Sequence, residues 1–289
     1  MPALEVAESD EQITVSGADF SVRFDKASGT IASYRHRQTE LIRSGLRPHF
    51  WRAWTDNDRG NGMPERCAPW RAASDNWVIT ETSTRQLDPS VLEIRVRGSF
   101  PDVGSTNEIV YTVYGNGEID VGNSFQPGER ELPELPRFGM QMTLPDEFET
   151  MTWYGRGLHE SYWDRKSGAA VGVYSGSVDE QYFNYSEPQE NGNKTDVRWV
   201  SLTNSQGLGL QAVGTEPLSV SALRYGTDAM EVAKHTYEME RQDFITLNLD
   251  FKQTGVGGDN SWGARAHPEY TVEAKAYHYS FRLRPVGAD

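Results

Sequence analysis

Short runs of alternating side chains, joined by tight turns, constrain the fold of this chain more than any other feature. The clearest pair is residues 108–114 and 118–123, which the sequence Gly-Asn-Gly at positions 115–117 joins. Asn-Gly tolerates the positive φ angles that two-residue hairpin turns require, so this segment predicts an antiparallel hairpin. Similar strand-like runs occur at residues 13–15, 20–24, 31–34, 91–96, 169–174, 197–202, 208–213, 244–251 and 277–283.

Turn-forming residues separate these runs along the whole length. The chain has 27 glycines and 14 prolines among its 289 residues, and only residues 227–240 have a pattern that predicts a short helix. Many short strands with frequent turns are typical of an all-β antiparallel sandwich or barrel. We predict a single domain over residues 1–289, in which the proline-rich residues 126–136 form a crossover between sheets or a weak boundary.

Charge and hydropathy exclude some classes of partner. The formal net charge is -14 and the mean hydropathy is -0.65, which argues against nucleic acid and against an anionic membrane as partners. No apolar run approaches the length of a membrane span. Residues 1–10 lack the charged and apolar regions of a signal peptide, which favours a cytoplasmic location and leaves a periplasmic one open.

Motifs for metal ions and for reactive cysteine are incomplete. Cys67 has no second cysteine to pair with, which excludes an internal disulfide and a cysteine-based zinc cluster and favours a buried bystander. Residues 56–60 begin like a calcium-binding loop, but Gly60 stands at the fifth position and Cys67 at the twelfth. We therefore expect no metal site and no cofactor in this chain.

Residues 153–210 combine aromatic, amide and charged side chains with frequent glycines. Within them, residues 189–199 form a polar loop between two strand-like runs. Amides and carboxylates bind sugar hydroxyls, and aromatic rings pack on the C–H faces of sugars, so this composition suits a sugar site. A polar loop held together by its own hydrogen bonds fits the composition too, and it is the more common case.

Four blocks of this chain resemble the C-terminal domain of the large β-galactosidases of glycoside hydrolase family 2, which hydrolyse lactose. They are residues 51–61 (WRAWTDNDRGN), 153–166 (WYGRGLHESYWDRK), 188–199 (PQENGNKTDVRW) and 255–262 (GVGGDNSW), and the similarity extends along nearly the whole chain. Two departures stand out: the usual GPHENY of the family reads GLHESY at residues 157–162, and Trp54 replaces the usual proline of RAPTDND. In some members this domain is a separate small subunit.

The resemblance implies a fold and a set of partners. The fold is a very large antiparallel sandwich of two sheets, a supersandwich related to galactose mutarotase. The catalytic glutamates of the family lie in a separate (β/α)-barrel domain, which this chain does not contain, and Mg and Na assist that barrel. The expected partners are the barrel-containing part of a β-galactosidase and a terminal β-D-galactoside such as lactose, in a full enzyme that forms an oligomer.

Glycoside hydrolysis uses two carboxylates, which lie roughly 5 Å apart in retaining enzymes. Glu160 and Glu190 are the pair that the polar stretch suggests. The chain has 42 acidic residues, so such pairs arise readily by chance. The alternative is that both glutamates form structural salt bridges with Arg156, Arg165 or Arg198. We favour the structural interpretation and assign no catalytic residue to this chain.

Trp262 is the strongest candidate for contact with a substrate. It follows a glycine-rich loop, residues 255–261, which is free to present one large ring, and an indole packs well on the apolar face of a pyranose. In the resembling family this tryptophan reaches into the pocket of the barrel and serves as a platform for the sugar. A core tryptophan is the alternative. Asp259 and Asn260 complete the substrate-binding region and are expected to shape the loop.

Residues 55–66 are the second candidate region. Glycine and amide residues in a short polar run predict a mobile surface segment, and the family has a loop at this place that closes over the pocket when substrate binds. The resemblance makes Gly60 the hinge, with Asn61 to Glu65 as the moving part. An ordinary exposed loop is the alternative.

Two other classes of function remain open. A carbohydrate-binding or subunit-scaffolding module without catalysis would present a second exposed aromatic patch away from Trp262. An independent mutarotase-like enzyme would need a histidine base and a carboxylic acid in one pocket. His159, His235 and His278 can be considered for that base, although no sequence pattern pairs any of them with a particular glutamate.

Overall fold

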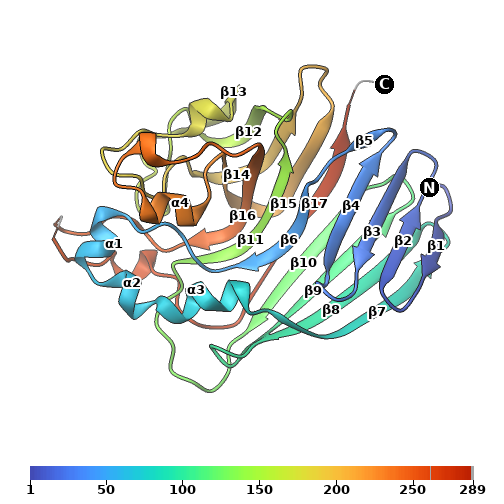
Figure 1. Ribbon diagram of the computed structural model, residues 1–289, viewed down its shortest axis with the longest axis horizontal. Helices are drawn as coiled ribbons and strands as arrows, with labels where there is room; N and C mark the ends of the chain where they lie inside the picture. Colours follow the sequence, from blue (N-terminus) through green and yellow to red (C-terminus); the bar gives the residue numbers. More distant parts are fainter. Residues whose placement is uncertain (261, 288–289) are drawn as a thin grey trace.

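Antiparallel β-strands build most of the molecule, in a smaller N-terminal sheet and a larger curved sheet (Figure 1). The computed structural model describes residues 1–260 and 262–287. The smaller sheet has the order β1-β2-β3-β4-β5. Its strands are β1 (Glu5–Glu8), β2 (Gln12–Ser16), β3 (Phe20–Asp25), β4 (Thr30–His36) and β5 (Thr39–Glu40).

The larger sheet has the order β13-β12-β14-β15-β17-β10-β9-β8-β7, and β16, β11 and β6 branch from it at β15. Its strands are β6 (Ser44–His49), β7 (Val78–Asp88), β8 (Val91–Phe100), β9 (Ser105–Tyr114), β10 (Ile119–Gln126), β11 (Arg137–Pro145), β12 (Thr150–Gly157), β13 (Ala170–Ser177), β14 (Lys194–Thr203), β15 (Gly209–Leu223), β16 (Phe244–Gln253) and β17 (Tyr277–Val286).

The long strand β15 joins two segments of the larger sheet. Its first part, from Gly209 to Gly214, pairs with β17, whereas its last part, from Ser219 to Leu223, pairs with β16. One strand therefore belongs to two segments, which lets the sheet curl and enclose an interior. All the strand pairs are antiparallel, so the predicted all-β antiparallel class is confirmed.

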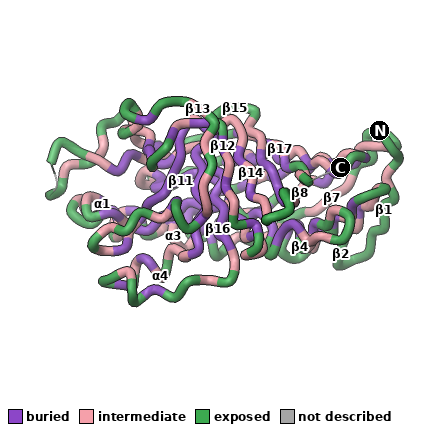
Figure 2. The backbone as a smooth tube through the Cα atoms, turned by 90° about the horizontal axis from the view of Figure 1, so that it is seen from above, coloured by how far each residue is buried: buried purple, intermediate pink, exposed green. Residues whose placement is uncertain are grey.

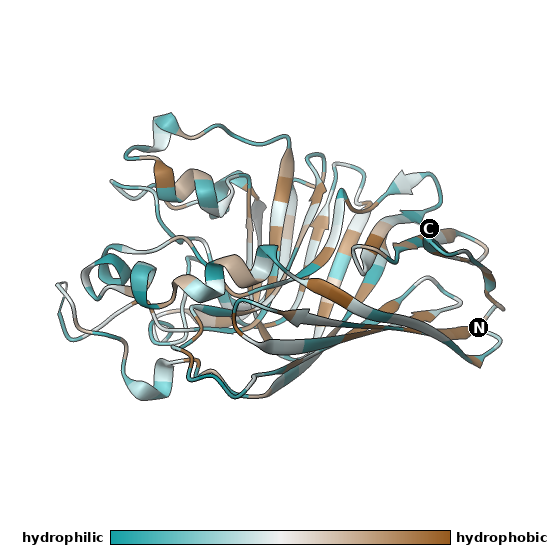
Figure 3. Cartoon of the chain, turned by 60° about the horizontal axis from the view of Figure 1, so that its bottom comes forward, coloured by the Kyte–Doolittle hydropathy of each residue, from teal (hydrophilic) through white to brown (hydrophobic). Residues whose placement is uncertain are grey.

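The alternation that predicted the strands also explains which face is buried. In β9 and β10 every second side chain is buried, among them Ile109, Val113, Ile119 and Val121, as expected for strands with one solvated face. Figure 3 shows hydrophobic and hydrophilic residues alternating along several strands of the larger sheet. In β16, by contrast, residues 245–250 are all buried, which indicates that both faces of this strand are covered.

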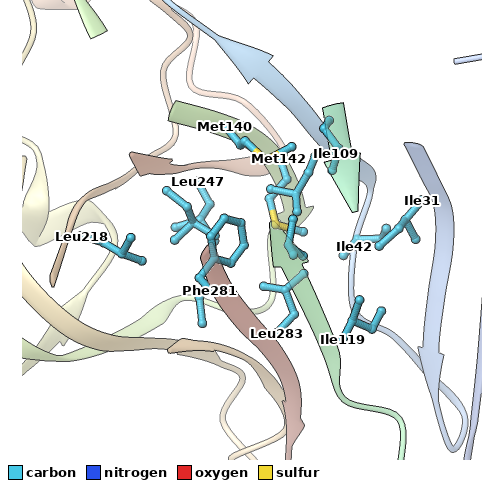
Figure 4. Close-up of a cluster of buried hydrophobic side chains, with 14 of the residues drawn as sticks. Ile31, Ile42, Ile109, Ile119, Met140, Met142, Leu218, Leu247, Phe281 and Leu283 are labelled. Atoms are coloured by element: carbon cyan, nitrogen blue, oxygen red, sulfur yellow. The ribbon is translucent and has the colours of Figure 1, made fainter. Parts of the chain in front are cut away.

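A continuous hydrophobic core connects the two sheets. One cluster of buried apolar side chains extends from Ile13 in the smaller sheet to Leu283 in β17. Met140 and Met142 of β11 contribute to it beside Ile109 of β9 (Figure 4). Figure 2 shows the buried residues concentrated in the central strands, with exposed residues toward the connecting loops.

The smaller sheet packs on the hairpin of β9 and β10. The hydroxyl of Tyr34 donates a hydrogen bond of 2.5 Å to the carbonyl of Gly117, and the rings of Phe24 and Tyr111 lie edge to face with centroids 5.0 Å apart. The predicted hairpin is confirmed, because β9 pairs directly with β10. Gly117 has φ 86°, the left-handed backbone that the turn required.

The chain is more helical than the sequence pattern predicted. The helix α4 (Thr227–Val232) covers only the first part of residues 227–240, and a 3-10 turn, η2 (Thr236–Glu238), follows it. The prediction of one short helix was wrong, because the connection from β6 to β7 also forms helices. These are α1 (Asp56–Gly60), α2 (Met63–Arg66) and α3 (Ala68–Asp75).

Local signals for these extra helices are present in the sequence. Thr55 caps α1 and forms a capping box with Asp58, because each side chain accepts a hydrogen bond from the other residue's backbone N–H. A proline lies in the first turn of both α2 and α3, where its missing N–H costs nothing. The segment was read as a loop because each helix is too short to show a hydrophobic period.

The strand-like runs in the sequence did not include β1, β5, β6, β7, β11 or β12. The strand β7 has no buried side chain in its pattern, so it lacks the alternation that identifies a half-buried strand. The proline-rich residues 126–136 lead from β10 to β11, which pairs with β16 and β6 rather than with β10. Since β10 and β11 belong to the same larger sheet, these residues connect two parts of one sheet, and the predicted crossover between sheets was wrong.

Candidate functional site

The connection after β16 carries Trp262 away from the body of the molecule. We call residues 255–267 the Trp262 loop; it ends at the 3-10 turn η3 (Pro268–Tyr270). It projects at one end of the molecule, beside α1 and α2 (Figure 1). Trp262 is 83% exposed, so the alternative of a core tryptophan is wrong for this residue. Ser261, which the sequence analysis placed in the same loop, lies outside the described residues.

Side chains near α1 bind the carbonyl groups at the start of this loop. The Arg52 guanidinium donates hydrogen bonds to the carbonyls of Thr254 and Gly255, the latter at 3.1 Å. The Asn57 amide donates to the carbonyl of Val256 at 3.0 Å. Arg52 is itself fixed by Asp58, at 2.8 and 3.1 Å, and both side chains are buried. The base of the loop is therefore tied to α1.

Asp164 accepts hydrogen bonds from backbone N–H groups of the same segment. Its two carboxylate oxygens accept hydrogen bonds from Val256 N at 3.1 Å and from Gly257 N at 2.7 Å. A Cβ atom added to Gly255 would lie 2.6 Å from the Asp164 carboxylate carbon, closer than carbon atoms can pack. The glycine at position 255 is therefore required by this close approach, not by an unusual φ angle.

Asp259 and Asn260 bind atoms of the loop itself. The Asn260 side-chain oxygen accepts hydrogen bonds from the backbone N–H of Trp262 at 3.0 Å and of Ala264 at 3.2 Å. Asp259 lies 2.9 Å from His267 Nε2, and this hydrogen bond raises the pKa of His267. These contacts hold the exposed part of the loop in shape.

The predicted mobile segment, residues 55–66, forms α1 and α2 and lies against the Trp262 loop. A Cβ atom on Gly60 would lie 3.4 Å from the Trp262 carbonyl carbon, so the predicted hinge is in contact distance of the predicted platform. Asp58 and Met63 are buried, whereas Asn61 and Glu65 are not. The segment is thus anchored at these two buried side chains, and the motion of Asn61 to Glu65 about Gly60 stays a prediction.

A pocket of about 260 Å³ separates this segment from the far end of the Trp262 loop. Arg66 lies in its wall and forms a salt bridge of 2.6 Å with Glu134; it also donates to the carbonyl of Asn61 at 2.6 Å. The other wall includes Arg265 and Glu273. The pocket is small and charged on both sides, and it lies where residues 61–65 would need room to move.

Glu160 does not have the surroundings of a general acid. Its carboxylate accepts hydrogen bonds from Arg165 at 2.6 Å, from the backbone N–H of Gly192 at 2.8 Å and from the hydroxyl of Tyr185. All three partners belong to the polar stretch that the sequence analysis singled out. The structural interpretation of this residue therefore holds, with Arg165 as its arginine.

Glu190 belongs to a separate buried group, which we call the Arg137 cluster: Arg137, Glu190, Asp250, Asn193 and Gln253. Arg137 Nη2 donates to Glu190 at 2.9 Å, and Arg137 Nε lies 3.0 Å from an Asp250 oxygen. Gln253 donates to Glu190 at 3.3 Å and to Asn193 at 3.0 Å. Burial raises the pKa of Asp250 to about 8 despite the opposing effect of Arg137.

The predicted arginine partners of Glu190 were wrong, because it pairs with Arg137. Arg137 lies in β11, a strand that the sequence analysis missed, so it was not considered. Arg156 pairs instead with Asp196 at 2.5 Å, and Arg198 donates to the Asp196 carbonyl at 2.6 Å. Arginines close in sequence to Glu190 are thus used by another residue, because β12 and β14 bring Arg156 and Asp196 together.

The structure also locates Cys67 and bears on metal clusters and membrane-spanning helices. Burial raises the pKa of the Cys67 thiol to about 12, so it is not a reactive nucleophile. Within residues 1–260 and 262–287, no three His, Cys, Asp or Glu side chains come together in a way that could hold a metal ion. Over the same residues, no helix combines the length and apolar character needed to span a membrane.

The histidines considered for mutarotase chemistry lack an acid partner. His278 Nδ1 lies 2.9 Å from the hydroxyl of Ser124, and His235 stacks on Tyr237 with ring centroids 5.3 Å apart. In the described part of the chain, neither of them nor His159 lies within 4.0 Å of a carboxylate oxygen. These histidines offer no acid and base pair.

Sequence reasoning missed the residues that anchor the candidate site. Asp164 stands inside the block WYGRGLHESYWDRK and Arg52 inside WRAWTDNDRGN, so both were part of quoted motifs without receiving a role. Their partners lie in a third block, GVGGDNSW. The three blocks are far apart in the sequence, and the fold brings them together at one end of the molecule.

Comparison with known sequences gives consistent matches. A family profile described as β-galactosidase small chain matches residues 16–283. The β-galactosidase of Priestia megaterium (strain DSM 319 / IMG 1521) is 42% identical over 287 residues, which is 99% of this chain. The β-galactosidase of Streptococcus thermophilus is 35% identical over 287 residues, which is 98% of this chain. The chain spans only 28% of the length of either relative.

Comparison with solved structures identifies the fold. A galactose 1-epimerase from Lactobacillus acidophilus NCFM superposes with a TM-score of 0.56 at 9% identity, with 100% of both chains covered. A GalM/aldose epimerase homologue from C. elegans gives a TM-score of 0.52 at 8% identity, again with 100% of both chains covered. Identity this low shows the fold alone, and it confirms the predicted galactose mutarotase-like sandwich.

Proposed function

The chain belongs to the β-galactosidase small-chain family, and we propose that it completes an active site whose catalytic glutamates lie in a separate barrel-containing portion. In this proposal the assembled enzyme hydrolyses terminal β-D-galactosides, lactose among them. This chain contributes Trp262 as an aromatic platform for the sugar and residues 61–65 as a segment that closes over it. Mg and Na, where they assist the reaction, belong to the barrel.

The exposed ring of Trp262 on an anchored loop carries the proposal. Trp262 is 83% exposed. Covering such a large aromatic side chain with a partner or a substrate is favourable, because it removes apolar surface from water. Loops that bind ligands need a rigid base so that the ring is already placed before binding. Such a base is supplied by the hydrogen bonds that Arg52 donates to carbonyls in residues 254–257 and that Asp164 accepts from N–H groups of the same segment.

The closing segment is supported by its contact with this loop. Gly60 lies against the backbone of Trp262, and the pocket beside Arg66 leaves space next to residues 61–65. Anchorage of α1 through the buried Asp58 would keep one end of the segment fixed during closure. The proposal therefore places the hinge after Asp58, at Gly60.

The absence of a catalytic pair is supported by how the two candidate glutamates are used. Glu160 accepts hydrogen bonds from a backbone N–H, an arginine and a tyrosine, and Glu190 is buried against Arg137. Neither is free to donate a proton to a glycosidic oxygen. The chain also spans only 28% of the length of its relatives, which leaves ample sequence for a barrel.

The proposal is tested by hydrolysis of nitrophenyl β-galactoside, first with this chain alone and then with the barrel-containing portion added. We expect no hydrolysis by the chain alone and hydrolysis on mixing. Robust hydrolysis by the pure chain would overturn the proposal, because a complete carboxylate pair would then have to lie within it.

The role of Trp262 is tested in the assembled enzyme. Trp262→Ala should raise the KM for the galactoside about tenfold, which corresponds to about 1.4 kcal/mol of lost sugar contact, while Trp262→Phe retains part of the affinity. Tyr237 is a matched control because it is also 83% exposed. Tyr237→Ala should leave the KM unchanged.

A second candidate function is a carbohydrate-binding or scaffolding module. It is favoured by exposed aromatic side chains away from the Trp262 loop: Tyr237, and Phe183, which is 53% exposed. The segments that carry them are adjacent, because the hydroxyl of Thr236 donates to the side chain of Asn184. No hydrolysis on mixing, together with galactoside binding that Tyr237→Ala abolishes, would make this function the better one.

A further inference from the structure

We propose that Asp164 is a positioning residue for the Trp262 platform: its carboxylate fixes the start of the Trp262 loop and thereby sets where the indole meets the sugar. The inference rests on the proposed role of Trp262 and adds to it a residue that contacts neither the sugar nor the indole.

Asp164 binds two neighbouring backbone N–H groups at the start of the Trp262 loop. The two Asp164 oxygens accept hydrogen bonds from two successive backbone N–H groups, Val256 at 3.1 Å and Gly257 at 2.7 Å. A carboxylate that binds two neighbouring N–H groups restrains the peptide plane between them, because both bonds must keep their direction. These two hydrogen bonds lie only a few residues before Trp262 in the sequence.

The carbonyl groups of the same segment are bound from the other side. Those of Gly255 and Val256 accept hydrogen bonds from Arg52 at 3.1 Å and from Asn57 at 3.0 Å. Residues 255–257 therefore have partners for carbonyl groups and for N–H groups. Among the described residues, Asp164 is the only acidic side chain that binds this backbone. Without it, the buried Val256 keeps its carbonyl partner but loses the acceptor for its N–H.

The two glycines of this segment leave room for the Asp164 carboxylate. Cβ atoms at Gly255 and Gly257 would lie 2.6 Å from the Asp164 carboxylate carbon and 3.1 Å from one of its oxygens. The Gly-x-Gly spacing therefore lets the carboxylate approach the backbone closely. These glycines are explained by packing against Asp164, since neither has a positive φ angle.

The neighbouring residue, Trp163, holds the other end of the loop. The Trp163 indole N–H donates to the carbonyl of Glu269 at 2.9 Å, in the 3-10 turn that follows the loop. The ammonium groups of Lys252 and Lys166 lie 4.1 and 4.7 Å from the centroid of the Trp163 ring. Residues 163 and 164 therefore bridge the two ends of the Trp262 loop.

The test compares Asp164→Ala and Asp164→Asn in the assembled enzyme, with nitrophenyl β-galactoside as substrate. Asp164→Ala should raise the KM several-fold, approaching the effect of Trp262→Ala, and change kcat much less. Asp164→Asn retains one acceptor oxygen and should restore part of the affinity. In the double variant Asp164→Ala/Trp262→Ala, the KM should equal that of Trp262→Ala alone, because the displaced ring is already absent.

Asp88→Ala is the matched control. Asp88 also accepts a hydrogen bond from a backbone N–H, that of Ser90 at 3.0 Å, but it is the last residue of β7, before the turn to β8. This variant should leave the KM unchanged. A variant of Asp164 that folds and keeps the wild-type KM, or effects that multiply in the double variant, would overturn the inference while leaving the platform in place. A Trp262→Ala enzyme with wild-type KM would overturn both.

Discussion

The Arg137 cluster and the Trp262 loop use charged side chains in opposite ways. In the cluster, Arg137 binds Glu190 and Asp250, and all three side chains are buried within the sheet. At the loop, Arg52 and Asp164 bind backbone groups, and the aromatic ring that follows is left exposed. The cluster fixes how strands pack, whereas the loop fixes where one ring points.

This difference separates two kinds of consequence. Changes in the cluster should alter the free energy of unfolding, since buried charges without a partner are costly. Changes at the tip of the loop should alter substrate affinity and leave stability almost untouched, because exposed side chains contribute little to folding. Both regions are polar and rich in amides, so composition alone does not distinguish them.

The largest effect should come from removing the shared cation of the cluster. Arg137→Met leaves Glu190 buried without its counter-charge and the protonated Asp250 without its arginine partner, and we expect a loss of about 3–5 kcal/mol in the free energy of unfolding. The measurement is urea-induced unfolding followed by circular dichroism. Trp262→Ala, the corresponding change in the loop, should stay within about 0.5 kcal/mol of wild type.

Neutralising Glu190 would sharpen this result. Adding Glu190→Gln to Arg137→Met should recover part of the lost stability, because it removes the uncompensated charge. Arg137→Met as stable as the wild type would show that the cluster is not a charged structural element, and the contrast with the loop would fail.

The next effect is a dependence on pH that belongs to the cluster alone. The pKa of Asp250 is raised to about 8 in the folded state, so between about pH 4 and pH 8 the folded state holds this proton while the unfolded state loses it. The stability that this group contributes is greatest at low pH and falls as the pH rises through this window. The side-chain amide of Asp250→Asn does not titrate in this window, so the variant lacks this contribution to the pH dependence of stability.

Relative to wild type, Asp250→Asn should therefore gain stability as the pH rises, by about 1.4 kcal/mol per pH unit at most. Urea unfolding of both proteins at pH 5, 6 and 7 measures the difference. A difference in unfolding free energy that stays constant over these pH values would show that Asp250 is ionised in the folded protein, with Arg137 as its full counter-charge.

The smallest effect should come from the exposed ion pair in the loop. Asp259→Asn removes the carboxylate that raises the pKa of His267, so this pKa should fall, as followed by NMR titration of the imidazole. In the wild type, the ion pair between His267 and Asp259 is present below the raised pKa of His267, and it is lost as the pH rises through that pKa. The KM of the assembled enzyme should change by less than about twofold, since Asn260 still binds the loop backbone; a change as large as that of Trp262→Ala would place Asp259 in contact with the sugar.

How far the sequence predicted the site depends on the distance between partners along the chain. Trp262, Asn260 and Asp259 stand within one short block, so their grouping followed directly from the sequence. Asp164 and Arg52 lie in other blocks, and nothing in their spacing shows that both bind residues 254–257. Helices α1 to α3 were missed for a local reason, because they are shorter than the window in which a helical period can be recognised.

By itself the sequence determined the all-β antiparallel class, the hairpin at residues 115–117 and membership of the family, because alternation, turn chemistry and ordered motifs are local properties of the chain. Only the tertiary structure decided which charges meet. Asp250 meets Arg137 because β11 and β16 are neighbours in the sheet, and Asp164 meets Gly257 because the end of β16 lies beside the segment after β12. Contacts between residues so distant in sequence depend on strand order, which local patterns do not encode.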